Sequence, residues 1–141
     1  MKITVTGPES SGTSLVSRIF RNAGADVYHR SATYRTEWMM LAPLADACDA
    51  MIVVFRDPIA TMKSQQAEGL TQYEADSKLR SGYYEIACAI RLVSVPVYCI
   101  TYEQLVLDRN SIRPLLALLG LDADADIEEV RNENMKYEDY Q

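Results

Sequence analysis

Residues 3–15 read ITVTGPESSGTSL, and this stretch decides the fold. Its first part is a short β-branched run that predicts a buried strand. Gly7 and Gly12, five positions apart, bound a turn whose backbone can curl so that successive N–H groups point inward. From Thr13 onward the apolar positions recur at helical spacing. A strand, a glycine-bounded turn and a helix in this order predict a loop that holds an anion, because the helix adds the positive potential of its N-terminal end.

The remainder of the chain alternates between strand-like and helix-like patterns. Strands are predicted at residues 25–29, 50–55 and 95–100. Helices are predicted at residues 13–23, 36–47, 59–67 and 72–94. A further helix is predicted from a cap at Asn110 or Ser111 to Gly120, and a last acidic helix at about residues 125–134. This alternation predicts an α/β protein with the three-layer P-loop fold, in which helices flank a mostly parallel sheet. The length of 141 residues fits one domain, with residues 1–121 as its body and residues 122–141 as an acidic C-terminal helix or tail.

Charge is distributed unevenly along the chain. Residues 122–141 carry eight acidic and two basic side chains and account for the whole net charge of −6. An acidic tail repels nucleic acid, whereas a small anion held by backbone amides and a few arginines remains compatible with this composition. No apolar run reaches the roughly 20 residues of a membrane span, and the N-terminus lacks the features of a signal peptide. With three dispersed cysteines and a single histidine, we expect a cytoplasmic protein with no membrane partner and no metal site.

The turn matches the P-loop pattern G-x-x-x-x-G-K-[ST] except at one position, where Thr13 replaces the lysine. In nucleoside triphosphate chemistry that lysine meets the β- and γ-phosphates, so its replacement disfavours an ordinary ATPase or GTPase. The backbone amides and the hydroxyls of Ser11, Thr13 and Ser14 can still bind the oxygens of an anion. A Gly-Pro turn followed by a helix cap, with no ligand, is the simpler interpretation and stays open.

The Ser-Gly-Thr-Ser sequence in this setting resembles the 5′-phosphosulfate loop of the sulfotransferase family, whose members bind 3′-phosphoadenosine 5′-phosphosulfate (PAPS). A second match is VVFRDP at residues 53–58 with Ser64 eight positions after Arg56, which is the form of the family's 3′-phosphate site. An arginine at a strand end can also simply pair with its neighbour Asp57. A third, softer match is ITYEQLV at residues 100–106, followed by a leucine-rich helix, where Glu103 is expected to cap or brace the loops.

Together the matches span roughly residues 3–121 in the family's order. The resemblance implies a protein that binds PAPS, or its product 3′-phosphoadenosine 5′-phosphate (PAP), and transfers a sulfuryl group to a hydroxyl or amine of a small molecule, glycan or peptide. It assigns the following residues to the cofactor: Ser10, Ser11, Gly12, Thr13, Ser14, Arg56 and Ser64.

The sequence departs from the family at two places. Most relatives carry lysine or arginine directly before Ser-Gly-Thr, whereas this chain has Ser10 there, preceded by Glu9. Losing one positioned donor typically costs about 10²–10³-fold in rate. Either another cation substitutes, with Arg18, Arg30, Arg35 and Lys63 as candidates, or the protein binds the donor without turning it over well. The late basic, glycine-containing segment that closes the nucleotide site in many members also has no counterpart.

The family's base is a histidine or a glutamate, and the candidates here are His29 and Glu37. The candidate wall for an acceptor is residues 28–49, with Tyr28, Tyr34, Trp38, Met39 and Met40, although such side chains are more often core. Two other functions stay open. One is a degenerate P-loop kinase or NTPase with Asp57 as a magnesium ligand, and the other is a non-catalytic nucleotide-binding or interaction module.

Overall fold

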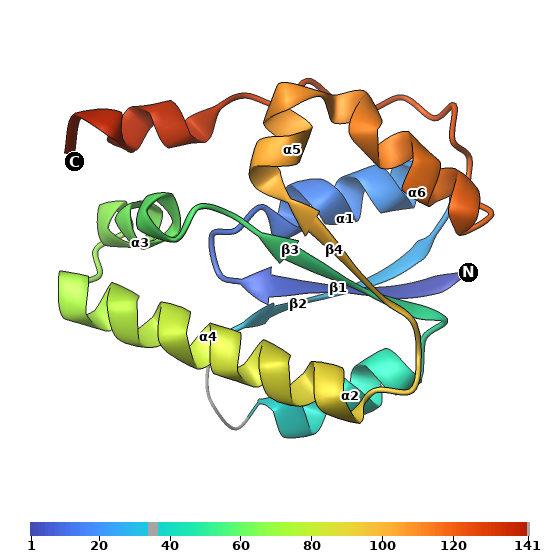
Figure 1. Ribbon diagram of the computed structural model, residues 1–141, viewed down its shortest axis with the longest axis horizontal. Helices are drawn as coiled ribbons and strands as arrows, with labels where there is room; N and C mark the ends of the chain where they lie inside the picture. The colour runs from blue at the N-terminus through green and yellow to red at the C-terminus, as the bar shows by residue number, and fades with distance from the viewer. Residues whose placement is uncertain (34–36, 141) are drawn as a thin grey trace.

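Four parallel strands form the centre of the protein in the computed structural model, which describes residues 1–33 and 37–140 and their side chains up to residue 137. The strands are β1 (Lys2–Pro8), β2 (Asp26–Ala32), β3 (Ala50–Phe55) and β4 (Val97–Thr101). Their order across the sheet is β2-β1-β3-β4, and every neighbouring pair is parallel. The carboxyl ends of β1 and β3 therefore meet at one edge of the sheet, where ligands bind in folds of this type (Figure 1).

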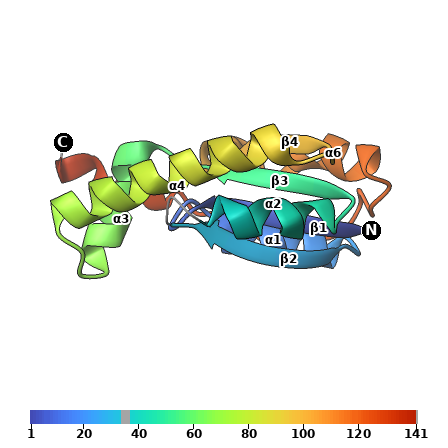
Figure 2. The ribbon, with the colours of Figure 1, turned by 90° about the horizontal axis from the view of Figure 1, so that it is seen from below.

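Helices cover both faces of the sheet, so the predicted α/β class with a parallel sheet is confirmed. One face carries α1 (Thr13–Asn22), α5 (Tyr102–Leu107) and α6 (Arg113–Leu118), and the other carries α2 (Trp38–Asp46) and α4 (Gln72–Leu92). Figure 2 shows the second face, with α4 crossing the sheet beside α2. Helix α3 (Pro58–Ala67) lies beyond the end of β3, toward the start of α4 (Figure 1).

Each face of the sheet has its own apolar core. The larger core joins Ile3 and Val5 of β1 to Phe20 of α1 and extends to Leu116 of α6. The smaller core lies under α2 and α4 and includes Met51 and Val53 of β3. Since β3 alternates between these two cores, nearly all of its side chains are buried, which explains its continuous apolar run.

The C-terminal region differs from the prediction. The helix expected at residues 125–134 is absent, and the chain runs irregularly until a 3₁₀ helix, η2 (Glu133–Tyr140). Arg113 holds the start of this segment, because its Nη1 donates to the carbonyl oxygens of Ala123 (2.6 Å) and Ala125 (2.9 Å), and the second of these would serve the first turn of the predicted helix. Ile127 is buried in the larger core and fixes the irregular segment against the domain.

The predicted helix before Gly120 is also split. A 3₁₀ turn, η1 (Arg109–Ile112), precedes α6, and the side chain of Asp108 caps it by accepting from the Asn110 amide at 2.9 Å. The expected cap at Asn110 or Ser111 is wrong, because α6 follows Ile112 and has no side-chain cap. The short helix α5 was not predicted, although Thr101 caps it through the Gln104 amide at 3.2 Å.

Gly82 sets how closely α4 approaches the sheet. A Cβ atom at this position would lie 2.6 Å from the carbonyl oxygen of Ala32 and 3.7 Å from the Cα of Pro8. We expect Gly82→Ala to lower the free energy of unfolding by about 1–3 kcal/mol, although alanine normally stabilises a helix by about 0.5–1 kcal/mol. Urea denaturation measures this. Ser77→Ala, at an exposed position of the same helix, is the control and should change stability by a few tenths of a kcal/mol at most; equal effects would contradict the packing argument.

Candidate functional site

The loop of residues 7–14, called the first loop below, joins β1 to α1. Gly7 is required because a Cβ there would lie 2.3 Å from the carbonyl oxygen of Val54 on the neighbouring strand. Gly12 has φ 97°, and a side chain there would also crowd the ring of Tyr102 at 3.2 Å. Ser10 adopts a left-handed φ of 67°, which is uncommon for a residue other than glycine. The loop thus combines two steric requirements for glycine with one strained serine, a pattern found at functional sites.

The amides that follow this turn are suited to an anion. The Ser11 amide donates to the Pro8 carbonyl at 3.1 Å, so it closes the turn, in contrast to the expected role as an anion donor. Helix α1 begins at Thr13 with no side-chain cap, and in the described part of the chain no backbone acceptor is recorded for the amides of Gly12, Thr13 and Ser14. Unpaired amides at a helix N-terminus are favourable partners for negative charge.

A cleft of about 310 Å³ opens over the first loop. Its lining residues come from the loop, from β2 and from the segment after β3: Glu9, Ser10, Gly12, Thr13, Ser14, Ser31, Arg56, Ser64 and Glu68. The two segments that were predicted to bind one cofactor thus face the same cleft. Ser11 is the exception among the predicted cofactor residues, since it is fully buried and its hydroxyl has no described partner. The carboxylates of Glu9 and Glu68 are lining residues that the sequence did not single out.

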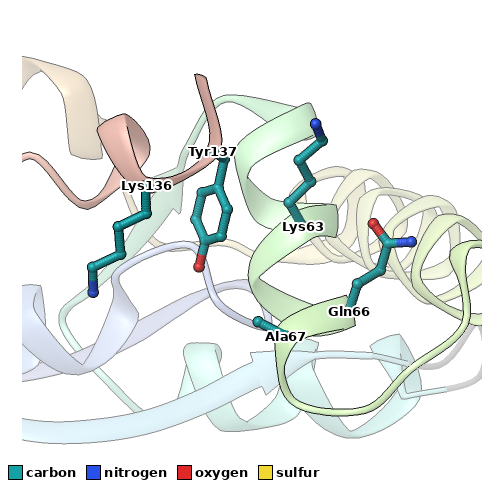
Figure 3. Close-up of a pocket in the computed structure, with 5 residues that line it drawn as sticks. All are labelled: Lys63, Gln66, Ala67, Lys136 and Tyr137. Atoms are coloured by element: carbon teal, nitrogen blue, oxygen red, sulfur yellow. The ribbon is translucent and has the colours of Figure 1, made fainter. Parts of the chain in front are cut away.

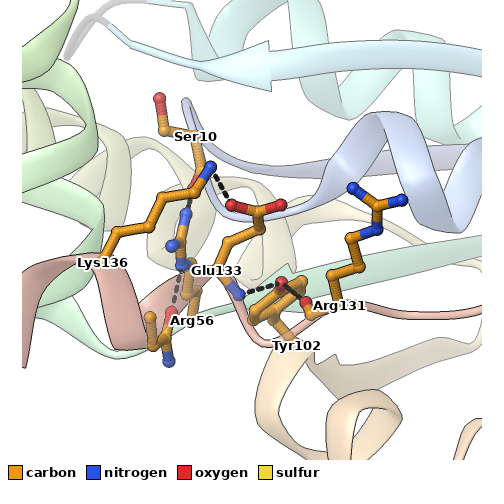
Figure 4. Close-up of polar contacts among 7 residues, drawn as sticks. Ser10, Arg56, Tyr102, Arg131, Glu133 and Lys136 are labelled. Atoms are coloured by element: carbon orange, nitrogen blue, oxygen red, sulfur yellow. Dashed lines mark hydrogen bonds and ion pairs between the residues drawn. The ribbon is translucent and has the colours of Figure 1, made fainter.

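Arg56 is the most unusual charged residue of the cleft because only 9% of it is exposed. Its Nη1 donates to the Ser10 carbonyl at 3.0 Å and its Nε to Oδ1 of Asn134 at 2.6 Å (Figure 4). The guanidinium also lies over the rings of Tyr102 and Tyr137, at 5.0 and 5.8 Å from their centroids. Its Nη2 is buried and has no partner among the described residues. Both hydrogen-bond acceptors of this buried cation are neutral, so no ion pair cancels its positive charge.

Asp57 does not neutralise Arg56. Its Oδ1 caps α3 by accepting from the Ala60 amide at 2.9 Å, while its own amide donates to Glu103 at 2.6 Å. The described carboxylates form no ion pair with Arg56. The alternative in which Arg56 simply pairs with Asp57 is therefore wrong, and the predicted bracing role of Glu103 is confirmed.

The acidic tail returns to this site, which the sequence did not indicate. The Tyr102 hydroxyl donates to the Arg131 carbonyl and accepts from the Glu133 amide at 3.0 Å, and Lys136 pairs with Glu133 (Figure 4). Beyond these contacts the tail and α3 enclose a second pocket of about 460 Å³. Tyr137 lies toward α3 in this pocket, whereas Lys63 and Lys136 point to different sides (Figure 3).

The two candidate bases are not brought together. His29 contacts Thr13, with 2.8 Å between Nε2 and Oγ1, and burial together with the nearby Arg21 lowers the pKa of its imidazole. Glu37 instead accepts from the Thr33 hydroxyl at 3.1 Å and pairs with Arg30 at 3.5 Å. Successive residues of β2 point to opposite faces, so His29 and Arg30 direct these contacts to different sides of the sheet. Neither His29 nor Glu37 lines the cleft.

The candidate replacements for the missing cation lie elsewhere. Arg18 is exposed and pairs with Glu128, and Arg30 is engaged with Glu37. Arg35 lies outside the described residues, and Lys63 lines the second pocket. The structure adds a further cation beside the loop, Lys78 of α4, whose Nζ lies 2.5 Å from Oε2 of Glu9. No spacing in the sequence connects this helix position with the loop.

The candidate acceptor wall is partly exposed. Met39 and Met40 are 62% and 61% exposed, so the alternative that these two methionines belong to the core is wrong. Tyr28 is also exposed, and Tyr34 lies outside the described residues. Within residues 28–49, Ser31 lines the cleft above the first loop, whereas Tyr28, Trp38, Met39 and Met40 do not.

Comparison with models of known protein families gives no match, and none of the curated proteins matches the sequence. Among the described helices, none combines the length and the apolar character needed to cross a membrane. Within residues 1–33 and 37–140, no three histidine, cysteine, aspartate or glutamate side chains gather closely enough to hold a metal ion. The functional assignment therefore depends on the chemistry of the cleft.

Proposed function

We propose that the cleft between the first loop and Arg56 binds PAPS or PAP, and that the protein is sulfotransferase-like, with a P-loop fold. The observation that carries the proposal is the buried guanidinium of Arg56, which has an unpartnered Nη2 and forms no ion pair with a described carboxylate. Burying a cation without a counter-charge is unfavourable, so the protein alone gains little from this arrangement. An oxyanion supplied by a ligand would compensate the charge.

The cleft offers two separate places for negative charge. The amides of Gly12, Thr13 and Ser14 suit one oxyanion, and Arg56 with the Ser64 hydroxyl suits another. A ligand with two phosphate groups on one nucleoside, such as PAP, matches this pair better than a single phosphate. PAPS would add an activated sulfuryl group at the first of these places. His29, whose imidazole pKa is lowered by burial and by Arg21, contacts the loop through Thr13 and is the candidate base.

Binding without efficient turnover is the second candidate function. Glu9 and Glu68 place carboxylates along the same cleft, and Lys78 engages Glu9. Carboxylates beside the reacting group disfavour negative charge that develops on a leaving phosphate.

The kinase alternative receives less support, because Asp57 caps α3 and Thr13 occupies the position of the P-loop lysine.

Calorimetry with three nucleotides tests the proposal. We expect PAP to bind at least tenfold more tightly than adenosine 5′-monophosphate, which lacks the 3′-phosphate, because charge-assisted hydrogen bonds contribute about 1.5–3 kcal/mol each. ATP with magnesium should bind more weakly than PAP.

Ser64→Ala should weaken PAP binding several-fold and leave the affinity for the monophosphate unchanged. Equal binding of PAP and the monophosphate would contradict the 3′-phosphate assignment, and magnesium-dependent preference for ATP would favour the kinase alternative.

A further inference from the structure

Asn134 of the tail lies between the buried arginine and a carboxylate. Its Oδ1 accepts from Nε of Arg56 at 2.6 Å, and its Nδ2 donates to Oε1 of Glu103 at 2.9 Å. Glu103 Oε1 also accepts from the Asp57 amide at 2.6 Å, which fixes the carboxylate next to the end of β3. One side-chain amide therefore contacts a cation on one side and an anion on the other.

The chemistry of this contact keeps Arg56 charged toward the cleft. The two described acceptors of its guanidinium, the Ser10 carbonyl and the Asn134 amide, are both neutral. A carboxylate at either place would form an ion pair and cancel the charge that an anionic ligand needs. Because Nε of Arg56 already donates to Oδ1 of Asn134, this donor is not available to Glu103. The remaining donor group, Nη2, has no described partner.

The Tyr102 and Tyr137 rings support the same arrangement. Arg56 lies over both rings. The Tyr102 hydroxyl fixes the tail through Arg131 and Glu133 (Figure 4). Aromatic faces stabilise a cation without neutralising it. The tail residues that contact Arg56 are thus an amide and an aromatic ring, although the tail as a whole is strongly acidic.

We propose that Asn134 is a positioning residue that holds Arg56 by a neutral acceptor and separates it from Glu103, so that the guanidinium keeps its charge for an oxyanion of the ligand. This inference rests on the proposed function for the identity of the ligand. It assigns to the C-terminal tail a direct part in the anion site. It also explains why Nε and Nη1 are engaged while Nη2 is left without a partner.

Asn134→Asp tests the inference, because it replaces the amide by a carboxylate of the same shape. We expect PAP affinity to fall at least tenfold, since the new carboxylate pairs with Arg56. Asn132→Asp adds the same charge at an exposed tail position and should change the affinity less than twofold. Asn134→Ala should also weaken PAP binding, because Glu103 is then free to approach Arg56. Tighter binding by Asn134→Ala would show that the tail competes with the ligand, and would overturn the inference.

A stability cycle tests the same contact without any ligand. Asn134→Asp loses the donor to Glu103 and meets its carboxylate in both backgrounds. The urea midpoint should therefore fall in an Arg56→Met background, and should fall clearly less or rise in the wild-type background, where the new carboxylate also gains an ion pair with Arg56. Equal shifts in both backgrounds would overturn the inference even if PAP binds. If PAP fails to bind the wild type but the cycle behaves as expected, the proposed ligand is wrong. The role of Asn134 as the residue that separates Arg56 from Glu103 is then retained.

Discussion

Replacing Arg56 with methionine is expected to weaken PAP binding by about 100-fold or more while leaving the folded protein as stable as the wild type or more stable. The binding loss follows because charge-assisted hydrogen bonds to an oxyanion contribute about 1.5–3 kcal/mol each. Stability should be retained because the wild-type guanidinium is 9% exposed and forms no ion pair with a described carboxylate. Replacing buried charged groups by apolar ones of similar volume is often neutral or stabilising by about 1–4 kcal/mol. Calorimetry and urea denaturation measure the two effects.

Two variants control this experiment. Arg56→Lys keeps the charge but loses the planar fork, so we expect an intermediate loss of affinity, about tenfold. Arg18→Met removes an exposed arginine that pairs with Glu128 and should leave PAP binding unchanged. If Arg56→Met binds PAP within threefold of the wild type, Arg56 is not part of the site. A large loss of stability would instead mean that its hydrogen bonds to Ser10 and Asn134 outweigh the cost of the buried charge.

Glu85→Gln is expected to remove most of the pH dependence of stability between about pH 4.5 and pH 7. Glu85 is fully buried on α4, and its Oε2 accepts from the Thr33 amide at 3.0 Å. Burial, reinforced by the nearby Glu37, raises its pKa from 4.5 to about 7, although the Thr33 amide and Arg30 act in the opposite direction. Since the folded state holds the proton more tightly than the unfolded state, the stability of the protein falls as the pH rises through this window.

The size of the effect distinguishes Glu85 from an ordinary surface acid. The shift in its pKa corresponds to a loss on the order of 3 kcal/mol between about pH 4.5 and pH 8. Glutamine is neutral and can keep the contact with Thr33, so the variant should match the wild type near pH 4.5 and exceed it at pH 8. Urea midpoints across this range provide the measurement, with the exposed Glu129→Gln as the control. Parallel pH profiles for wild type and Glu85→Gln would refute a buried, protonated Glu85.

The placement of the cleft could be predicted because it follows from local patterns and one rule of parallel sheets. The first loop follows β1 and Arg56 follows β3, and these strands are neighbours whose carboxyl ends meet. The helical position of Ser64, eight residues after Arg56, then places its side chain in the same cleft. The two loops follow from periodicity and spacing within short segments, whereas Ser64 was singled out by the resemblance to the sulfotransferase family.

The contacts of the tail could not be predicted in this way. Asn134 is 78 positions from Arg56, and no pattern in the acidic segment marks it. The predicted acidic helix fails because Arg113 binds two carbonyls of that segment and because Ile127 enters the core. Lys78 reaches Glu9 only through the path of α4 across the sheet. These are long-range packing outcomes, which propensity does not determine.

The anion site of the cleft is tested most directly by a crystal structure of the protein with PAP. We predict the 5′-phosphate on the amides of Gly12, Thr13 and Ser14, and the 3′-phosphate on Nη2 of Arg56 and the Ser64 hydroxyl. Asn134 should still accept from Nε of Arg56. A nucleotide found in the second pocket between α3 and the tail, with the first loop and Arg56 untouched, would contradict this account.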